Sequence, residues 1–598
     1  MICNAMSRKS FLGAMAATAT AGSCLAAAPW APANAVASES QASPSLAPGV
    51  YSSTWAGRNG DIVVTVTVSE DAIVNIEVAS HEETAQFGGK CLNEMPVQMI
   101  AAQSVQVDTF AGATITSNAL KAAVADCLGQ AGDAGAFSEP PAAGPEVQAS
   151  LSCDVVVVGS GISGMAAALS AAQGGARVIM LEKLSLSGGA ATGSGGAILA
   201  AGSVLQSDAD GNTDPAGLVE NLYRYSEEQA SLDLIEHVVS HSAEVIDWYV
   251  GLGVQFEVGQ CYGTPIHYAH RALNPDGSGK SGSNIFNKTY PAFLAAGGSC
   301  LLNTRATEVM LDADGAVCGV KAVSGGTTYS ISCRACVLAA GGYEGDADLL
   351  AQWSPHCGMQ MVDSLCHVGD TGDGILMGIA AGGYFVGTGY GQTTAAYTPV
   401  PAIKVTTEGK RYCNEMHSES DLDQGYQFKA FYDSGSQWTY TLYDSSTLDA
   451  DAAMALKKAK GGDIYEGDTV EEVASAAGVD PDGLRATVDR WNEEVAAGVD
   501  EDFGCEAIEA VGTYENGPFY LVPYTMVING TVGGLKTDFD SQVLREDGTA
   551  IPGLYAAGET CNGEFYYRLY PSGGASLLFG SVTGKIAGEN AAKIAAGV

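Results

Sequence analysis

The length, composition and charge of this chain narrow its function. Its 598 residues suffice for several domains, and the hydrophobic share of 46% allows large buried cores. The formal net charge of −40 argues against nucleic-acid binding, which needs a positively charged face. The 15 cysteines include no C-x-x-C-H motif, so no c-type haem is expected. One C-x-x-C, Cys333 to Cys336, is interpreted as part of a strand, and no metal site is predicted.

The N-terminus has the features of an export signal. Residues 7–12, S-R-K-S-F-L, precede an Ala-rich apolar run, and Ala33-Asn34-Ala35 offers a small-residue cleavage site. This pattern resembles a twin-arginine signal with lysine in the second position. We predict a signal peptide over residues 1–35 and a location outside the cytoplasm, in the periplasm or at the cell surface. Cys24 leaves lipidation, and so membrane association, open.

A small α+β domain is expected over residues 48–130. Residues 61–68 and 73–78 alternate in polarity like paired strands. Further on, Asp108, Gly112, Ala113 and Thr114 resemble the D-x-x-[ST]-G-A-[ST] pattern of FMN-binding domains, although Ala111 departs from it. The resemblance implies FMN joined covalently to the Thr114 hydroxyl and an FMN transferase as a maturation partner. Residues 131–150 are rich in Ala, Gly and Pro and are predicted to form a linker.

A dinucleotide-binding motif opens the long second domain. Four valines at 155–158 predict a buried strand, and Gly159, Gly161 and Gly164 follow with G-x-G-x-x-G spacing. In such a unit the glycines serve a tight turn, close approach of a pyrophosphate, and close helix–strand packing. A second strand then ends at Glu182, where an acidic residue should meet a ribose hydroxyl.

Several later glycine-rich turns are expected to converge on the same nucleotide, which we predict to be non-covalently bound FAD. The residues expected to contact it are Gly159, Gly161, Ser163, Gly164, Glu182, Lys183, Gly188, Gly189, Gly195, Gly196, Gly341, Gly342, Gly372, Asp373, Gly558, Glu559, Ser576 and Leu577.

Together these motifs resemble the FAD-dependent fumarate reductase (flavocytochrome c) family, with its urocanate reductase and 3-ketosteroid dehydrogenase relatives. The resemblance implies an α/β fold. A Rossmann-like FAD-binding domain over residues 151–388 and 528–598 would be interrupted by an α+β capping domain over residues 389–527. The substrate would lie between the two, against the flavin.

The positions that bind fumarate in this family are altered here. Glu419 stands where the proton-donating arginine is expected, and Asn529-Gly530 replaces a pair of histidines. The T-E-x-x-R-G segment is missing. Because a small dianion needs charge-assisted hydrogen bonds, these changes argue against fumarate as the substrate.

The segment that replaces the carboxylate site suggests ketone binding. Residues 570–575, Y-P-S-G-G-A, resemble the Y-P-G-x-G-A segment of ketosteroid dehydrogenases, which implies that Tyr570 and Gly574 hold a substrate carbonyl. Two such donors would stabilise the enolate formed by hydride addition to an enone. Arg568 is an alternative clamp for a carboxylate. The proton donor stays open, with these candidates: Tyr262, Tyr268, Tyr412, Tyr566, Tyr567, His417 and Glu419.

Three functions follow. The first is an exported reductase that passes electrons from an extracytoplasmic or membrane-associated donor through FMN to FAD. It would reduce a carbonyl-conjugated C=C bond, in an enone such as a 3-oxosteroid. The second is a reductase of an unsaturated acid of the arylacrylate type, with Arg568 as the clamp. The third is a non-catalytic two-flavin electron carrier.

Overall fold

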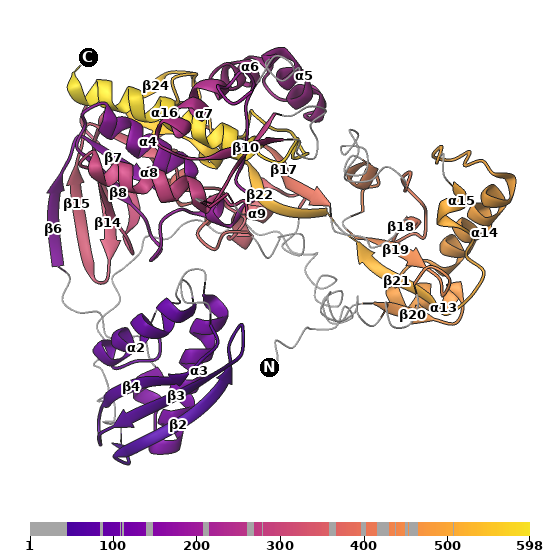
Figure 1. Ribbon diagram of the computed structural model, residues 1–598, viewed down its shortest axis with the longest axis horizontal. Coiled ribbons are helices and arrows are strands. Elements are labelled where there is room, and N and C mark those ends of the chain that lie inside the picture. Colours follow the sequence, from indigo (N-terminus) through magenta and orange to yellow (C-terminus); the bar gives the residue numbers. More distant parts are fainter. Residues whose placement is uncertain are drawn as a thin grey trace, which may run out of the picture. The chain divides into compact units, whose positions relative to one another are not determined.

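The computed structural model divides into two compact units, one within residues 1–141 and one that continues to the C-terminus (Figure 1). It describes residues 45–597 apart from 84–87, 108, 110–112, 139–146, 207–213, 260–267, 275, 278, 358–365, 396–401, 416–429, 437, 449–452, 454–463, 506–507 and 525. The predicted signal peptide lies outside the described residues. No described helix has both the length and the apolar character needed to cross a membrane.

The N-terminal unit is built on a three-stranded antiparallel sheet in the order β2 (Gly49–Ala56), β3 (Asp61–Val68) and β4 (Ile73–Ser80). Every second residue of β3 is buried, from Ile62 to Val68, as the alternating pattern predicts. Helices α2 (Lys90–Ala102) and α3 (Thr114–Ala131) complete the unit. Short strands β1 (Ser45–Leu46) and β5 (Gly132–Asp133) pair with each other.

A six-stranded sheet forms the centre of the second unit. Its order is β12 (Ser299–Leu301), β8 (Val178–Leu181), β7 (Val155–Val158), β16 (Ala335–Leu338), β24 (Ala550–Ala556) and β23 (Gln542–Leu544). All neighbours pair in parallel except β23 with β24. The four valines of β7 are buried, as expected of a central parallel strand covered on both faces.

Two helices pack closely beside this sheet. Helix α4 (Ile162–Gln173) follows β7, and α16 (Ala575–Ala596) follows the last turn of the chain (Figure 1). Gly584 and Gly588 of α16 face α4 so closely that an added methyl group would lie 2.3 Å and 2.1 Å from its backbone oxygens. Glycines four residues apart therefore bring the C-terminal helix against the first helix of the nucleotide motif.

Further elements surround the central sheet. A second sheet has the order β13 (Arg305–Leu311), β14 (Val317–Ser324), β15 (Thr327–Ser332) and β6 (Val147–Ser152), and a third joins β10 (Phe256–Gly259), β11 (Ala269–Ala272) and β9 (Ala197–Leu199). The additional helices are α5 (Pro215–Tyr225), α6 (Leu232–Ser240), α7 (Ser242–Gly251), α8 (Ser283–Ala295), α9 (Ala347–Trp353) and α10 (Asp373–Ala380). Cys333 and Cys336 are buried free thiols at the end of β15 and in β16.

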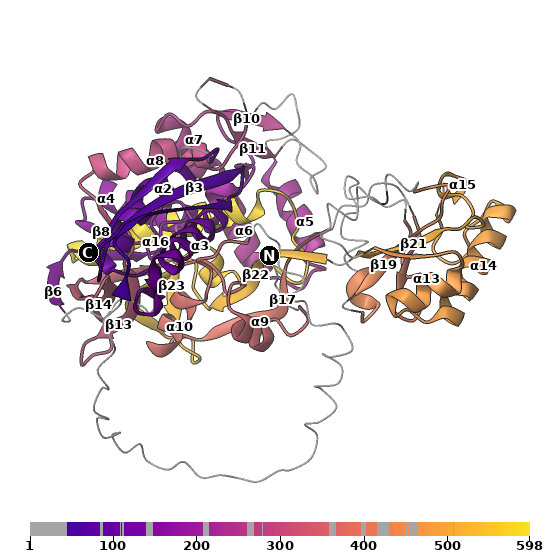
Figure 2. The ribbon, with the colours of Figure 1, turned by 90° about the horizontal axis from the view of Figure 1, so that it is seen from below.

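A separate sheet with its own helices is inserted in the chain between β17 (Phe385–Ala395) and β22 (Met526–Leu535), which pair antiparallel. Its strand order is β18 (Lys404–Thr406), β19 (Thr439–Tyr443), β21 (Phe519–Tyr524) and β20 (Tyr465–Gly467). Helix α13 (Val470–Ala477) lies beside β20 and β21, and α14 (Pro481–Ala497) and α15 (Ile508–Val511) follow (Figures 1 and 2). The predicted cap boundaries at 389 and 527 fall inside β17 and β22.

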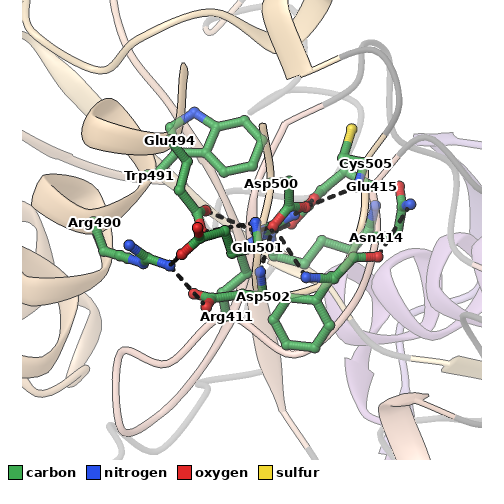
Figure 3. A network of polar contacts seen from close by, with 12 residues as sticks. Arg411, Asn414, Glu415, Arg490, Trp491, Glu494, Asp500, Glu501, Asp502 and Cys505 are labelled. Atoms are coloured by element: carbon green, nitrogen blue, oxygen red, sulfur yellow. Dashed lines mark hydrogen bonds and ion pairs between the residues drawn. The ribbon is translucent and has the colours of Figure 1, made fainter. Parts of the chain in front are cut away.

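A buried ion-pair network organises this inserted region (Figure 3). The Arg411 guanidinium makes two hydrogen bonds to Glu415, of 2.6 and 2.8 Å, and two to Asp500, of 2.6 and 2.9 Å. Its centre lies 4.4 Å from the Trp491 ring centroid. Asp500 also accepts the backbone N–H groups of Phe503 and residues 502 and 505. Arg411 thus connects the segment after β18, which holds Glu415, with α14 and with the loop after α14, which holds Asp500.

Candidate FAD and substrate site

The three glycines of the first turn differ in their surroundings in the way that their spacing predicts. Gly159 has φ +97°, and a methyl group there would lie 2.2 Å from the Ala339 carbonyl oxygen. A methyl group on Gly164 would lie 2.0 Å from the Gly159 carbonyl oxygen, so this glycine lets α4 pack on the turn. At Gly161, by contrast, no atom lies within 4 Å of such a methyl group. The turn thus leaves open backbone where a pyrophosphate would approach.

Glu182, at the end of β8, is held in place by the same turn. Its carboxylate accepts the Ser160 hydroxyl at 2.6 Å, the Ser160 backbone N–H at 3.1 Å and the Leu184 backbone N–H at 2.8 Å. Nearby, Asp373 pairs with Lys183 at 3.0 Å and Arg305 at 2.6 Å. Burial opposes ionisation of Asp373, but these two cations hold its pKa below the ordinary value.

A cavity is lined both by this turn and by the start of α16. It contains twelve of the predicted FAD-contacting residues: Gly159, Gly161, Ser163, Glu182, Lys183, Gly189, Gly341, Asp373, Gly558, Glu559, Ser576 and Leu577. Glycines and a buried acid at one end, with hydroxyl and amide groups at the other, are the donor set that a dinucleotide flavin requires. The residues present fit FAD.

Six predicted positions do not line the cavity: Gly164, Gly188, Gly195, Gly196, Gly342 and Gly372. Glycine is needed at some of these positions for backbone conformation or close packing. Gly372 has φ +75° and caps α10, and a methyl group on Gly342 would lie 2.2 Å from the Thr531 hydroxyl oxygen. Glycine-rich segments therefore predict which parts of the chain form the site better than they predict which individual residues line it.

Three carboxylates meet beside the cavity. Glu344, Asp370 and Glu559 each place an oxygen within 4.8 Å of the others, and Glu344 is only 1% exposed. Burial, with the neighbouring Asp370, raises the pKa of Glu559 to about 8. Burial, with Glu559 and Asp370, raises the pKa of Glu344 well above its ordinary value. Three negative charges cannot share this volume, so protons remain here at neutral pH.

Hydroxyl and amide groups gather at the other end of the cavity. The Ser576 hydroxyl donates to the Gln392 side-chain oxygen at 2.7 Å and lies 3.3 Å from the Tyr566 hydroxyl. The Tyr570 hydroxyl accepts the Ser576 backbone N–H at 3.2 Å. Burial raises the pKa of Tyr566 well above its ordinary value, so this phenol stays protonated. The start of α16 therefore anchors two tyrosines.

Arg568 is 8% exposed and already paired. Its Nε and Nη2 donate to the two oxygens of Glu227 at 2.5 and 2.9 Å, and Nη2 also donates to Asp433 at 3.0 Å. These partners raise the pKa of Arg568 further, against the effect of burial. The predicted carboxylate clamp is thus engaged by two carboxylates of the chain itself.

The remaining predicted residues are placed as follows. Gly574 has φ +100° and caps α16, and its carbonyl accepts the Leu199 backbone N–H at 3.4 Å. The Tyr567 carbonyl accepts the Thr388 hydroxyl at 2.7 Å. Helix α3 begins at Thr114. Tyr262, His417 and Glu419, together with the side chain of Thr114, lie outside the described residues.

The structure describes three other proton-donor candidates: Tyr268, Tyr412 and Tyr566. The Tyr268 hydroxyl donates to the Asp214 carbonyl at 3.0 Å, and the Tyr412 hydroxyl lies 3.2 Å from that of Thr439. Tyr566 lines the cavity, whereas Tyr268 and Tyr412 do not. Arg568, Tyr570 and Gly574 are also absent from the cavity lining, and Tyr570 is linked to it through Ser576. Sequence reasoning missed Glu227, Gln392 and Glu344, because none belongs to a recognisable motif.

Comparison with known proteins agrees with this geometry. A family described as "FAD binding domain" matches residues 154–577, and one described as "FMN-binding domain" matches residues 57–129. The fold and site define an FAD-dependent oxidoreductase. The chain belongs to the FAD-binding domain family of the fumarate reductases, with an FMN-binding domain in front, as the motifs predicted.

Individual relatives span several substrates. Urocanate reductase of Eggerthella lenta is 30% identical over 626 residues, covering 99% of this chain and 100% of that protein. The open conformation of a flavocytochrome c3 fumarate reductase is 28% identical, with a TM-score of 0.58 over 76% of this chain and 80% of that one. The 3-ketosteroid-Δ4-(5α)-dehydrogenase of Rhodococcus jostii RHA1, in complex with 4-androstene-3,17-dione, is 25% identical, with a TM-score of 0.59 over 74% and 97%.

Proposed function

We propose that this protein is an exported reductase that transfers electrons through FMN to FAD and reduces a C=C bond conjugated to an uncharged carbonyl, as in a 3-oxosteroid or a simpler enone. The observation that carries the proposal is the pairing of Arg568 with Glu227 and Asp433. A carboxylate substrate would have to displace Glu227, a half-buried bidentate partner of Arg568, whereas a ketone needs only neutral donors.

The residues that line the cavity, together with Tyr570 and Gly574 next to Ser576, suit this chemistry. Gly159, Gly161, Glu182 and Glu559 would hold the FAD, which supplies hydride to the substrate β-carbon when bound. Tyr570 is fixed by the Ser576 N–H at 3.2 Å and would donate its hydroxyl hydrogen to the substrate carbonyl, together with the Gly574 N–H. Such donors stabilise the negative charge that develops on the carbonyl oxygen.

A proton must then reach the α-carbon. Tyr566 is buried, lines the cavity and lies 3.3 Å from the Ser576 hydroxyl, which makes it the best-positioned donor among the described candidates. Its high pKa keeps it protonated until the carbanion forms.

A second candidate is the reduction of an unsaturated acid. It is supported by the full-length similarity to a protein named urocanate reductase. It requires Arg568 to exchange Glu227 for the substrate carboxylate. A non-catalytic electron carrier remains the third proposal, with a two-flavin chain that serves a partner at the cell surface.

A matched pair of substrates tests the proposal. Benzylideneacetone and cinnamate share a styryl group and differ in carrying a methyl ketone or a carboxylate. Anaerobically reduced protein should be reoxidised faster by the ketone, and fumarate should be inert. Faster reoxidation by cinnamate would favour the second candidate, and no reaction with any alkene would favour the carrier.

A further inference from the structure

Glu227 occupies a strained position that serves its contact with Arg568. It follows helix α5 in a turn where Glu227 and Glu228 have φ +53° and +59°. Two consecutive non-glycine residues in the left-handed region are disfavoured, and such strain persists where the surrounding structure enforces it. Here the turn is fixed by the Glu228 N–H on the Tyr223 carbonyl at 3.0 Å and the Ser231 N–H on the Glu564 carbonyl at 2.8 Å.

The contact itself is bidentate and largely shielded from water. The Arg568 and Glu227 side chains are 10% and 22% exposed, whereas that of Asp433 is 46% exposed. The rings of Tyr390, Tyr432 and Tyr567 surround the guanidinium carbon at 5.8–6.0 Å. Of the two acidic partners of Arg568, Glu227 therefore makes the bidentate contact and is the less exposed to solvent.

The residues around Arg568 do not line the cavity themselves, but two of them lie close along the chain to residues that do. Tyr566 and Gln392 line the cavity. Arg568 follows Tyr566 by two residues, and Tyr390 precedes Gln392 by two residues. The Thr388 hydroxyl joins the two segments through the Tyr567 carbonyl at 2.7 Å.

We propose that Glu227 is a specificity-determining residue: its carboxylate occupies the Arg568 guanidinium and so keeps substrate carboxylates from binding there. The inference rests on the proposed reduction of conjugated C=C bonds. The Glu227 carboxylate would shift the substrate preference of the enzyme from unsaturated acids toward uncharged carbonyl compounds. Removing the Glu227 charge should expose Arg568 to an acidic substrate.

The test compares E227Q with E228Q, a matched control from the same turn whose side chain is exposed. In flavin-loaded protein, E227Q should raise the ratio of kcat/KM for cinnamate over benzylideneacetone by about tenfold or more, mainly through KM. E228Q should leave the ratio unchanged. Adding Arg568→Met to E227Q should abolish the gain.

Calorimetric binding of cinnamate to the oxidised protein provides a readout without turnover. E227Q should bind cinnamate at least about tenfold more tightly than wild type. Unchanged binding and an unchanged ratio would overturn the inference, even if the ketone remained the better substrate. A wild type that prefers cinnamate, improved further by E227Q, would instead overturn only the proposed function. Should E227Q lose its flavin, Asp433→Asn must shift the ratio in the same direction or the inference fails.

Discussion

The backbone N–H of Ser576 donates to the Tyr570 hydroxyl oxygen at 3.2 Å. Ser576 lies in the first turn of α16, where backbone N–H groups have no partner within the helix. The phenol thereby satisfies one of these groups, and its ring packs against the main core. Its orientation is fixed before a substrate arrives, which is the property that a carbonyl-binding donor needs.

Replacing Tyr570 with Phe should therefore slow enone reduction strongly. Loss of one preorganised donor costs about 2–4 kcal/mol of transition-state stabilisation, or roughly 10²- to 10³-fold in kcat. Stopped-flow reoxidation of the reduced protein by benzylideneacetone measures this. Tyr384→Phe, at a residue that is 40% exposed, is the control. An unchanged rate in Tyr570→Phe would exclude the hydroxyl as a donor.

Two alanine substitutions in the first glycine turn should separate folding from FAD binding. Gly164→Ala places a methyl group 2.0 Å from the Gly159 carbonyl oxygen, so it should lower the free energy of unfolding by about 1–3 kcal/mol or more. Gly161→Ala meets no atom within 4 Å and should leave that free energy nearly unchanged while weakening FAD binding. Denaturant unfolding and FAD titration check the pair, and equal effects of both changes on stability would contradict the assignment.

These glycines explain how much could be predicted from the sequence. A G-x-G-x-x-G turn encodes its backbone distances locally, so the motif at 159–164 predicted the strand, the helix and the cavity wall together. The Glu227–Arg568 pair joins residues 341 positions apart, and only the folded chain brings them together. The same holds for Glu344, whose burial beside Asp370 and Glu559 leaves no trace in its own segment.

The carboxylate cluster predicts an unusual pH dependence of stability. Glu344 has a pKa well above its ordinary value of 4.5 when folded, so it keeps a proton that the unfolded chain releases. The unfolded state then binds fewer protons, and the free energy of unfolding must fall as pH rises above about 4.5. Glu344→Gln removes this pH-dependent contribution to the free energy of unfolding. The variant should gain stability relative to wild type between pH 5 and pH 8.

Denaturant unfolding of flavin-free protein at the two pH values measures that difference. Glu546→Gln, at an exposed position, is the matched control and should show no such trend. If the stability difference between Glu344→Gln and wild type were the same at both pH values, the buried carboxyl would have to be ionised throughout.

The Arg411 network should matter more for stability than the charged surface beside it. Arg411 and its partners Glu415 and Asp500 have side chains 0–6% exposed, so Arg411→Met strands two buried carboxylates and should cost about 3–5 kcal/mol. Arg485 pairs with Glu471 at 37% and 47% exposure, and Arg485→Ala should cost less than about 1 kcal/mol. Hydrogen exchange in β18 and α14 should rise in the first variant alone, and similar protection in both would contradict a stabilising role for Arg411.

The covalent FMN on Thr114 is the last prediction. A phosphoester needs a hydroxyl, so Thr114→Val should lose the flavin from the protein while Thr114→Ser should keep it. Thr109→Val, five residues earlier in the same segment and exposed, should also keep it. Mass spectrometry of the tryptic peptide, after expression with an FMN transferase, detects the adduct. Because FMN is the proposed entry point for electrons, Thr114→Val should stop reduction by the external donor, yet enone should still reoxidise FAD that has been reduced chemically. An FMN adduct retained in Thr114→Val would place the attachment on another hydroxyl.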